Sequence, residues 1–378
     1  MLTLLFYCTG FCSIIICSFT KHNIYVFKAL ITLLISILII ISISQDVGGD
    51  LVRYERKFYG MRIADIEWSR WVADQIQLLL KWIFNETTYE PMPLKREQDY
   101  LYSMHIYNQI DHYSFKFYQI ITNLVYIAGT FSFVNSTSYR NNNISKFLIL
   151  LLPVSMTFIT ISIEQSLSLG VVFFALSIIQ KNKLGFLLLV ILSGFIHWSS
   201  WIFLPLVFYD RRLFRNLLIL SLTFTLLLQI FNVNLVPFVV NTLTTLSNDL
   251  GVNFFDVFTT NIQNSVNIKQ ERVISWHHIY LNTFLVFCAV FFHMRFRNSL
   301  NFQDRKNSIL LVSTLIFLLI LSLIFKDVDN YVVRIGAMIK IISLICFVNT
   351  VYIINRYTGV INILLGINLT ILGVYSFY

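Results

Sequence analysis

Long apolar blocks recur along almost the whole chain. The longer ones hold roughly 17 to 25 residues, the length of α-helix that crosses about 30 Å of hydrocarbon. Hydrophobic residues make up 57% of the chain and charged residues 12%, about half the share found in soluble domains. We therefore predict an all-α polytopic membrane protein with about 10 transmembrane helices. The blocks lie at residues 2–19, 24–43, 115–134, 147–163, 166–180, 184–209, 213–232, 277–294, 308–325, 332–354 and 358–377.

Basic residues collect in the short joints between these blocks. Short loops rich in Lys and Arg remain in the cytoplasm, so the joints predict a topology with both termini outside. The formal net charge of +9 is then a consequence of topology, and no nucleic acid partner is needed to explain it. The joints hold Lys21 and Lys28; Arg140 and Lys146; Lys181 and Lys183; Arg211, Arg212 and Arg215; Arg295, Arg297, Arg305 and Lys306; and Arg356.

Two successive stretches of the chain are short for the membrane crossings that their flanking charges require. Residues 147–180 begin and end at cytoplasmic charges, so about 51 Å of helix must cross and return, with Glu164 and Gln165 at a tip below the outer surface. Residues 184–209 also have basic residues at both ends, which predicts a broken or re-entrant hairpin turning at residues 197–200. Irregular backbone at membrane depth needs a protein or aqueous lining, so the two hairpins predict a vestibule open to the outside.

Two large loops lie on that same outer side. We expect one integral membrane domain over residues 1–378, with a first large extracytoplasmic loop at 44–113 and a second at 233–276. The first loop contains an amphipathic stretch from Ile63 to Phe84. It suits a helix lying in the membrane interface, and equally an ordinary helix packed over the bundle.

Charged residues follow the second apolar block closely. If the chain is helical after Gly49, then Asp50, Arg53 and Tyr54 share one face, with Arg56 next to Arg53. Such a face offers a carboxylate base beside guanidinium groups that can bind phosphate with two parallel hydrogen bonds. The alternative is a local ion pair at a helix start, where an acid is favoured anyway.

Four further polar residues fall inside or beside the apolar blocks. Intramembrane carboxylates are costly and usually functional, which favours Glu164 as a site residue unless its tip reaches interfacial water. His197 is either a catalytic histidine or one that holds its turn. Arg334 near the outer interface suits a phosphate, and Lys340 requires an internal partner, for which Glu164 is a candidate, or a wet cavity. We expect no metal site and no cofactor, since the nucleotide-binding and zinc-protease motifs are missing from the sequence.

Four short motifs, in this order and spacing, resemble the EpsG-like and Wzy-type polysaccharide polymerases. That family usually has Arg-Gln at the first hairpin tip, where this chain has Glu164-Gln165. Either Arg334 or Lys340 supplies the missing positive charge, or the tip has a different role. The motifs are Gly48-Gly49-Asp50-Leu51-Val52-Arg53-Tyr54, Tyr89-Glu90-Pro91, Ser162 to Leu169, and Phe195-Ile196-His197-Trp198-Ser199-Ser200 before Leu204-Pro205.

The resemblance implies a glycosyltransferase with a GT-C-like fold in the bacterial inner membrane. It would join oligosaccharide repeats of O-antigen, capsule or exopolysaccharide, linked to undecaprenyl pyrophosphate, at the periplasmic face. A flippase and a chain-length regulator are possible partners. A lipid-linked oligosaccharide flippase, an O-antigen ligase and a membrane acyltransferase remain alternatives. The catalytic candidates are Asp50, His197 and Glu164, and the substrate-binding candidates are Arg53, Tyr54, Arg56, Glu90, Gln165, Ser199, Arg334 and Lys340.

Overall fold

The fold is described from a computed structural model. Candidate residues Asp50, Arg53, Tyr54, Arg56 and Glu90 lie outside the described residues, as does most of the last apolar block. The described residues are 2–19, 23–44, 71–84, 113–139, 143–152, 155, 163–231, 233, 235–250, 276–296, 298, 300–326, 329–354 and 366–368.

Every regular element in these residues is a helix, as the apolar blocks predicted. Six described helices are long and apolar enough to cross a membrane, so the protein is a multi-pass membrane protein. Four shorter apolar helices accompany them. The six candidate spans are Ile24–Ser44, Tyr113–Thr137, Arg212–Ile230, Ile279–Phe296, Phe302–Ile324 and Arg334–Ile353.

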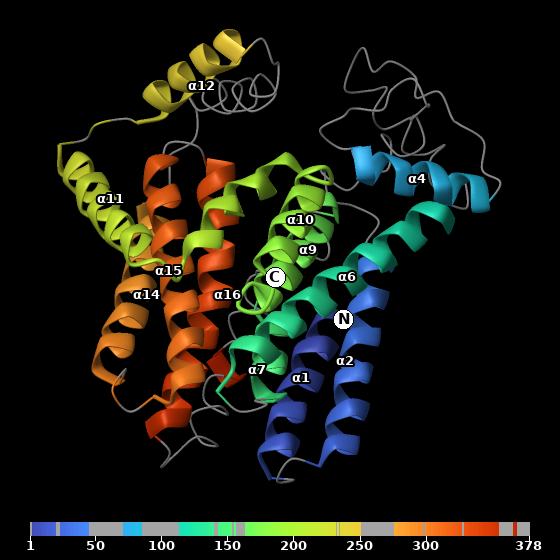
Figure 1. Cartoon of the computed structure of the whole chain (residues 1–378). Helices are drawn as coiled ribbons and strands as arrows, with labels where there is room; N and C mark the ends of the chain where they lie inside the picture. The colour runs from blue at the N-terminus through green and yellow to red at the C-terminus, as the bar shows by residue number, and fades with distance from the viewer. Residues whose placement is uncertain are drawn as a thin grey trace. The chain divides into compact units, whose positions relative to one another are not determined.

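The chain forms two compact units. Unit 1 comprises Met1–Asn135, Lys146–Leu204 and Ile363–Tyr378, and unit 2 comprises Ser136–Ser145 and Pro205–Asn362. Figure 1 labels the α-helices of both units, which together with the 3₁₀ helix η3 are the described helices. They are α1 (Leu2–Phe19), α2 (Ile24–Ser44), α4 (Trp71–Ile83), α6 (Tyr113–Thr137), α7 (Asn143–Leu150), α9 (Ile163–Ile178), α10 (Lys183–Gly194), η3 (Trp198–Phe208), α11 (Arg212–Ile230), α12 (Val236–Leu250), α14 (Trp276–Phe296), α15 (Phe302–Ile324) and α16 (Asp329–Ile354).

Unit 2 is organised around α15. Leu315, Leu318 and Leu319 have no solvent exposure, and the helix packs against α11, α14 and α16, as Figure 1 shows. Asn349 of α16 holds the end of α6 by donating from Nδ2 to the Thr137 carbonyl over 3.0 Å. The same side chain accepts from the Tyr139 amide over 3.3 Å. These bonds satisfy backbone groups at a helix end that would otherwise have no intrahelical partner.

The segment predicted as the second large loop contains a helix. We expected a loop over residues 233–276, and the structure has α12 within it. Its side chains include Val236 and Val240, which are buried one turn apart. A short amphipathic helix of this kind is weakly marked in a segment rich in Asn and Thr, because both residues have low helix propensity.

Unit 1 contains two helices that approach very closely. A Cβ atom on Gly129 of α6 would lie 1.9 Å from the carbonyl oxygen of Gly170 in α9. A Cβ on Gly170 would lie 2.7 Å from the Tyr126 Cα. Small residues allow helix backbones to approach in this way inside membranes, where dispersion and interhelical hydrogen bonds supply most of the attraction. The contact fixes where α9, and therefore its polar first turn, lies against α6.

The predicted break in block 184–209 is present. Helix α10 ends at Gly194, and a 3₁₀ helix, η3, begins at Trp198. The His197 amide donates to the Ser193 carbonyl over 2.9 Å, and the Ser200 amide donates to the His197 carbonyl over 3.0 Å. The turn therefore keeps its backbone groups paired while it presents a histidine between two helices.

Candidate functional site

Three segments that are distant in sequence meet within unit 1. They are α4, the first turns of α9, and the turn between α10 and η3. Ala73 and Leu80 of α4 pack in one buried cluster with Leu167 of α9 and Ile196 of the turn. The cluster also includes Phe115 and Tyr118 at the start of α6, which Figure 1 shows beside α4.

A backbone hydrogen bond joins two of these segments directly. The Val72 amide donates to the Phe195 carbonyl over 3.2 Å. Val72 lies in the first turn of α4, where amide groups have no intrahelical acceptor. The turn that carries His197 therefore satisfies the start of α4 and fixes the position of that helix.

Helix α4 has its polar face inward and an apolar face outward. Asp74, Gln77 and Lys81 are buried. They lie at positions i, i+3 and i+7, so they form one stripe along the helix. The outward face is formed by Trp71, Leu79, Trp82 and Ile83, all more than half exposed. In a water-soluble protein this arrangement would be inverted, so α4 has the surface of a helix with an apolar environment on its outer side.

The inward face of α4 meets the polar start of α9. Gln77 Nε2 donates a long hydrogen bond of 3.5 Å to Glu164 Oε1. Glu164 is only 3% exposed and its neighbour Gln165 only 5%. This burial does not fit the alternative in which the Glu164 carboxylate reaches interfacial water. The carboxylate is desolvated and has an amide donor, and residue types of this kind seldom occur inside without a role.

Serine hydroxyls tie α9 to α10 and η3 just below this point. Ser193 Oγ donates to the Ser168 carbonyl over 2.8 Å, and the Ser168 hydroxyl lies 2.9 Å from Ser193 Oγ. The Ser168 hydroxyl also bonds to Ser200 Oγ of η3. Hydroxyl pairs of this type hold membrane helices together without large side chains. They fix the position of the His197 turn along the axis of α9, relative to the first turn of that helix.

His197 is partly exposed and its ring is oriented. Its Nδ1 lies 2.7 Å from Ser199 Oγ, within hydrogen-bonding distance. A ring whose Nδ1–H donates to Ser199 has Nε2 as its acceptor atom, which is the form required of a general base. Ser199, named above as a substrate-binding candidate, is therefore positioned to orient the histidine.

The tight contact between Gly194 and Trp201 gives a testable prediction. A Cβ on Gly194 would lie 1.8 Å from Trp201 Nε1, which donates to the Ile191 carbonyl over 3.2 Å. Gly194→Ala should therefore displace the indole, shift the His197 turn and destabilise the protein by about 1–3 kcal/mol, the usual cost of overpacking. Adding Trp201→Ala should restore part of the loss, measured as the unfolding temperature of the purified protein. An additive double variant would show that the two positions are not coupled.

Four of the predicted site residues, Glu164, Gln165, His197 and Ser199, lie on two segments that the bonds of Ser168 join. Arg334 and Lys340 are half-buried residues of α16 and belong to unit 2. The pairing of Lys340 with Glu164 therefore stays a prediction. The sequence interpretation missed Asp74, Gln77 and Lys81, although their spacing within the amphipathic stretch indicated a shared helix face.

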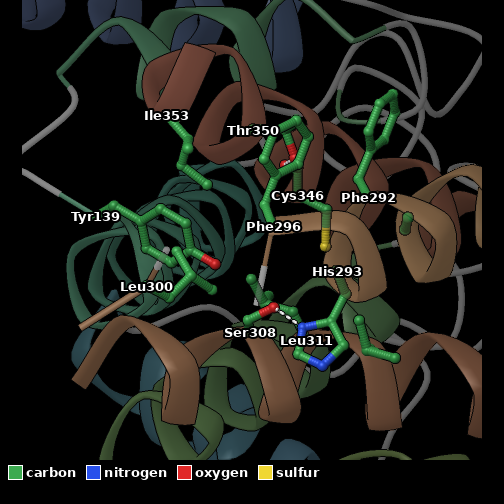
Figure 2. A pocket seen from close by; sticks show the side chains of 12 residues that line it. Tyr139, Phe292, His293, Phe296, Leu300, Ser308, Leu311, Cys346, Thr350 and Ile353 are labelled. Atoms are coloured by element: carbon green, nitrogen blue, oxygen red, sulfur yellow. Dashed lines mark hydrogen bonds between the residues drawn. The ribbon is translucent and has the colours of Figure 1, made fainter. Parts of the chain in front are cut away.

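Unit 2 contains a small polar pocket between α14, α15 and α16 (Figure 2). His293 Nδ1 bonds to the Ser308 hydroxyl, drawn as a dashed line, and Cys346 lies close to them. The Tyr139 side chain lines another part of the pocket, and burial raises the pKa of its phenol well above the usual range. Because aromatic and aliphatic side chains form the rest of the lining, this site has the character of a helix-packing contact with a polar centre.

No group of three or more His, Cys, Asp and Glu residues is arranged to hold a metal ion within the described part of the chain. The ionisable residues of the unit 1 site are two carboxylates, Asp74 and Glu164, with Lys81 and His197. These groups can accept or donate protons and hydrogen bonds. The arrangement suits acid–base chemistry on a polar substrate close to an apolar phase.

Together these features define an integral membrane protein with a polar site at the start of α9 and the end of α10. A family model matches residues 27–378, nearly the whole chain, and the chain belongs to the EpsG family. Neither the curated proteins nor the solved structures contain a match to the chain. The family assignment confirms the resemblance seen in the motifs at residues 48–54, 89–91, 162–169 and 195–205.

Proposed function

We propose that the protein is a polysaccharide polymerase that joins oligosaccharide repeats linked to undecaprenyl pyrophosphate at the periplasmic face of the bacterial inner membrane. Its membership of the EpsG family supports a role in polysaccharide synthesis. One observation carries the proposal: the segment with Glu164 and the segment with His197 both pack against α4 and form a polar site inside a membrane protein. The glycan is that of an O-antigen, a capsule or an exopolysaccharide.

The proposed topology has about ten spans in a GT-C-like arrangement, with both termini in the periplasm. Helices α9 and α10 have 16 and 12 residues, so they are about 24 Å and 18 Å long. With their shared turn at Lys181 and Lys183 in the cytoplasmic interface, both are shorter than the hydrocarbon core. Glu164 and His197 then lie below the outer surface, in a vestibule that a lipid-linked substrate reaches from the side and a glycan from outside.

The reaction transfers a glycan from one carrier to a hydroxyl of the next repeat. The bond between the anomeric carbon and the pyrophosphate oxygen breaks, and a glycosidic bond to the acceptor oxygen forms. The acceptor proton passes to a base, for which we propose His197 or Asp50. Undecaprenyl pyrophosphate leaves with the bonding electrons, stabilised by Arg53, Arg56 and Arg334.

The remaining candidates take supporting roles in this proposal. Glu164 and Gln165 lie at the membrane end of the site, and Ser199 orients His197. Tyr54, Glu90 and Lys340 contact substrate. A flippase supplies the lipid-linked repeats, and a chain-length regulator acts with the polymerase.

We propose that α4 borders the path of the lipid carrier. Its outward Trp71, Leu79, Trp82 and Ile83 suit the boundary between acyl chains and head groups, where tryptophan is favoured. Its inward face is part of the site. One helix therefore has the lipid phase on one side and the reacting glycan on the other.

A gel of surface polysaccharide tests the proposed reaction. Deleting the gene should collapse the ladder of polymer lengths to a single-repeat band, and wild type should restore it. Arg53→Ala should fail to restore it, because the leaving pyrophosphate would lose a charge-assisted partner. An unchanged ladder in the deletion strain would contradict polymerase function. Loss of both polymer and single repeats would indicate a flippase, and loss of glycan from the lipid A core would indicate a ligase.

A further inference from the structure

Five buried polar side chains lie where α4 meets the start of α9. We define the α4–α9 seam as Asp74, Gln77, Lys81, Glu164 and Gln165. All five are at least nine-tenths buried. The seam has two amides, two carboxylates and one ammonium group.

Two amide oxygens of the seam are buried acceptors with no hydrogen-bond partner among the described residues. They are Gln77 Oε1 and Gln165 Oε1. The orientation of the Gln77 amide follows from its neighbour, because the Glu164 carboxylate accepts from the Gln77 nitrogen and leaves the oxygen facing elsewhere. Buried acceptors without donors are uncommon, and a ligand or water can supply the missing hydrogen.

Both acceptors belong to residues next to Glu164. Gln77 approaches it from α4. Gln165 follows it in α9 and lies one turn before Ser168, whose hydroxyl bonds to Ser193 and Ser200. The open acceptors therefore belong to segments that pack together with the turn that carries His197.

The chemistry of the seam decides which part of a substrate it can bind. A pyrophosphate offers acceptor oxygens and negative charge, so it cannot donate to Gln77 or Gln165, and two carboxylates would repel it. A sugar ring offers several neutral O–H donors that also accept. Amides, carboxylates and an ammonium group together match this mixture.

We propose that the α4–α9 seam is a carbohydrate subsite that binds ring hydroxyls of the glycan and does not bind the pyrophosphate. The inference rests on the proposed polymerase function and adds the part of the substrate that this region recognises. Gln77 and Gln165 accept hydrogen bonds from sugar hydroxyls, and Lys81 donates to a sugar oxygen. Arginines elsewhere are left to bind the pyrophosphate.

Binding measurements on the full chain in lipid nanodiscs test the subsite. One probe is a set of oligosaccharides from partial acid hydrolysis of the host's surface polysaccharide, and the other is farnesyl pyrophosphate. Gln77→Met and Gln165→Met should each weaken oligosaccharide binding about five- to tenfold, since each removes one hydrogen-bond acceptor while keeping side-chain size. Binding of farnesyl pyrophosphate should change less than about twofold, a shift too small for the loss of a hydrogen bond.

Two control variants show whether the acceptor itself matters. Gln75→Met changes the same residue type on the exposed side of α4, so oligosaccharide binding should stay at the wild-type level. Gln165→Glu keeps acceptor oxygens at the site and should retain most oligosaccharide binding. Elution volume and unfolding temperature should match those of wild type for every variant compared.

Three outcomes would overturn the subsite. Folded Met variants that bind oligosaccharide as wild type does would make the seam a helix-packing contact. Variants that lose farnesyl pyrophosphate and keep oligosaccharide would make it a pyrophosphate site. In both cases deletion of the gene would still collapse the polymer ladder, so the proposed function would stand. A wild-type protein that binds neither probe, from a strain whose ladder survives deletion of the gene, would overturn the function and the subsite together.

Discussion

Replacing His197 with alanine should reduce polymer formation by about a hundred- to ten-thousandfold, the range that general acid–base catalysis contributes. The structure places this histidine in a backbone-paired turn between α10 and η3, with its Nδ1 beside Ser199. Removing the ring removes the acceptor for the substrate proton and leaves the turn's backbone bonds in place. Radiolabelled sugar incorporated into polymer, measured with purified protein and lipid-linked repeats, gives the rate.

A structural role for His197 predicts a different set of results. If the ring only holds the turn, His197→Gln should preserve activity by keeping a hydrogen bond to Ser199. If the ring is the base, His197→Gln should be as inactive as His197→Ala. The limb of the pH–rate profile that belongs to the histidine should then vanish in both variants. An active His197→Gln variant would move the role of base to Asp50.

Placing valine at Gly129 or Gly170 should prevent unit 1 from assembling. Even the first side-chain carbon at Gly129 would lie 1.9 Å from a backbone oxygen, and a backbone cannot move aside as a side-chain tip can. Helices α6 and α9 would have to separate, and the first turn of α9 would leave its place under α4. We expect little or no monodisperse protein after detergent extraction, measured by fluorescence-detected size-exclusion chromatography, and no polymer in cells.

Gly10→Ala is the matched control for this prediction. A Cβ at Gly10 would meet the side chain of Leu151, with Cδ2 at 2.4 Å, so a rotamer change can relieve the contact. This variant should be extracted at near wild-type levels. Normal extraction and activity of Gly170→Val would contradict the close approach of the two helices.

The helical framework could be predicted well from hydropathy alone. Helices α1, α2, α6, α11, α14, α15 and α16 start and end within about six residues of the apolar blocks, because about 20 apolar residues have few other stable arrangements. The break before η3 was also predictable, since basic residues at both ends of a 26-residue block exclude one continuous span. The same logic singled out His197 and Glu164 as candidates, since they are polar groups where apolar ones were expected, and their roles stay predictions.

The orientation of helix α4 could not be predicted from the sequence. Its apolar residues indicated the face that would pack against the bundle or enter the interface. Which of its faces turns inward depends on Glu164 and on the turn at Phe195, and neither is near α4 in the sequence. Periodicity identifies two faces of an amphipathic helix, but only the partners determine which one is buried. The substrate-contacting role of Gln77 therefore had no counterpart in the sequence interpretation.

The bond between Val72 and Phe195 has a consequence for the order of assembly. Its two ends are 123 residues apart in the sequence. Helix α4 therefore leaves the ribosome well before the turn that accepts the hydrogen bond from its Val72 amide. Contacts between distant segments form late, because closing a long loop costs chain entropy before any contact compensates it. The contacts of α4 with this turn therefore cannot form until α9 and α10 have been synthesised. The α4–α9 seam is thus completed only after most of unit 1 has left the ribosome.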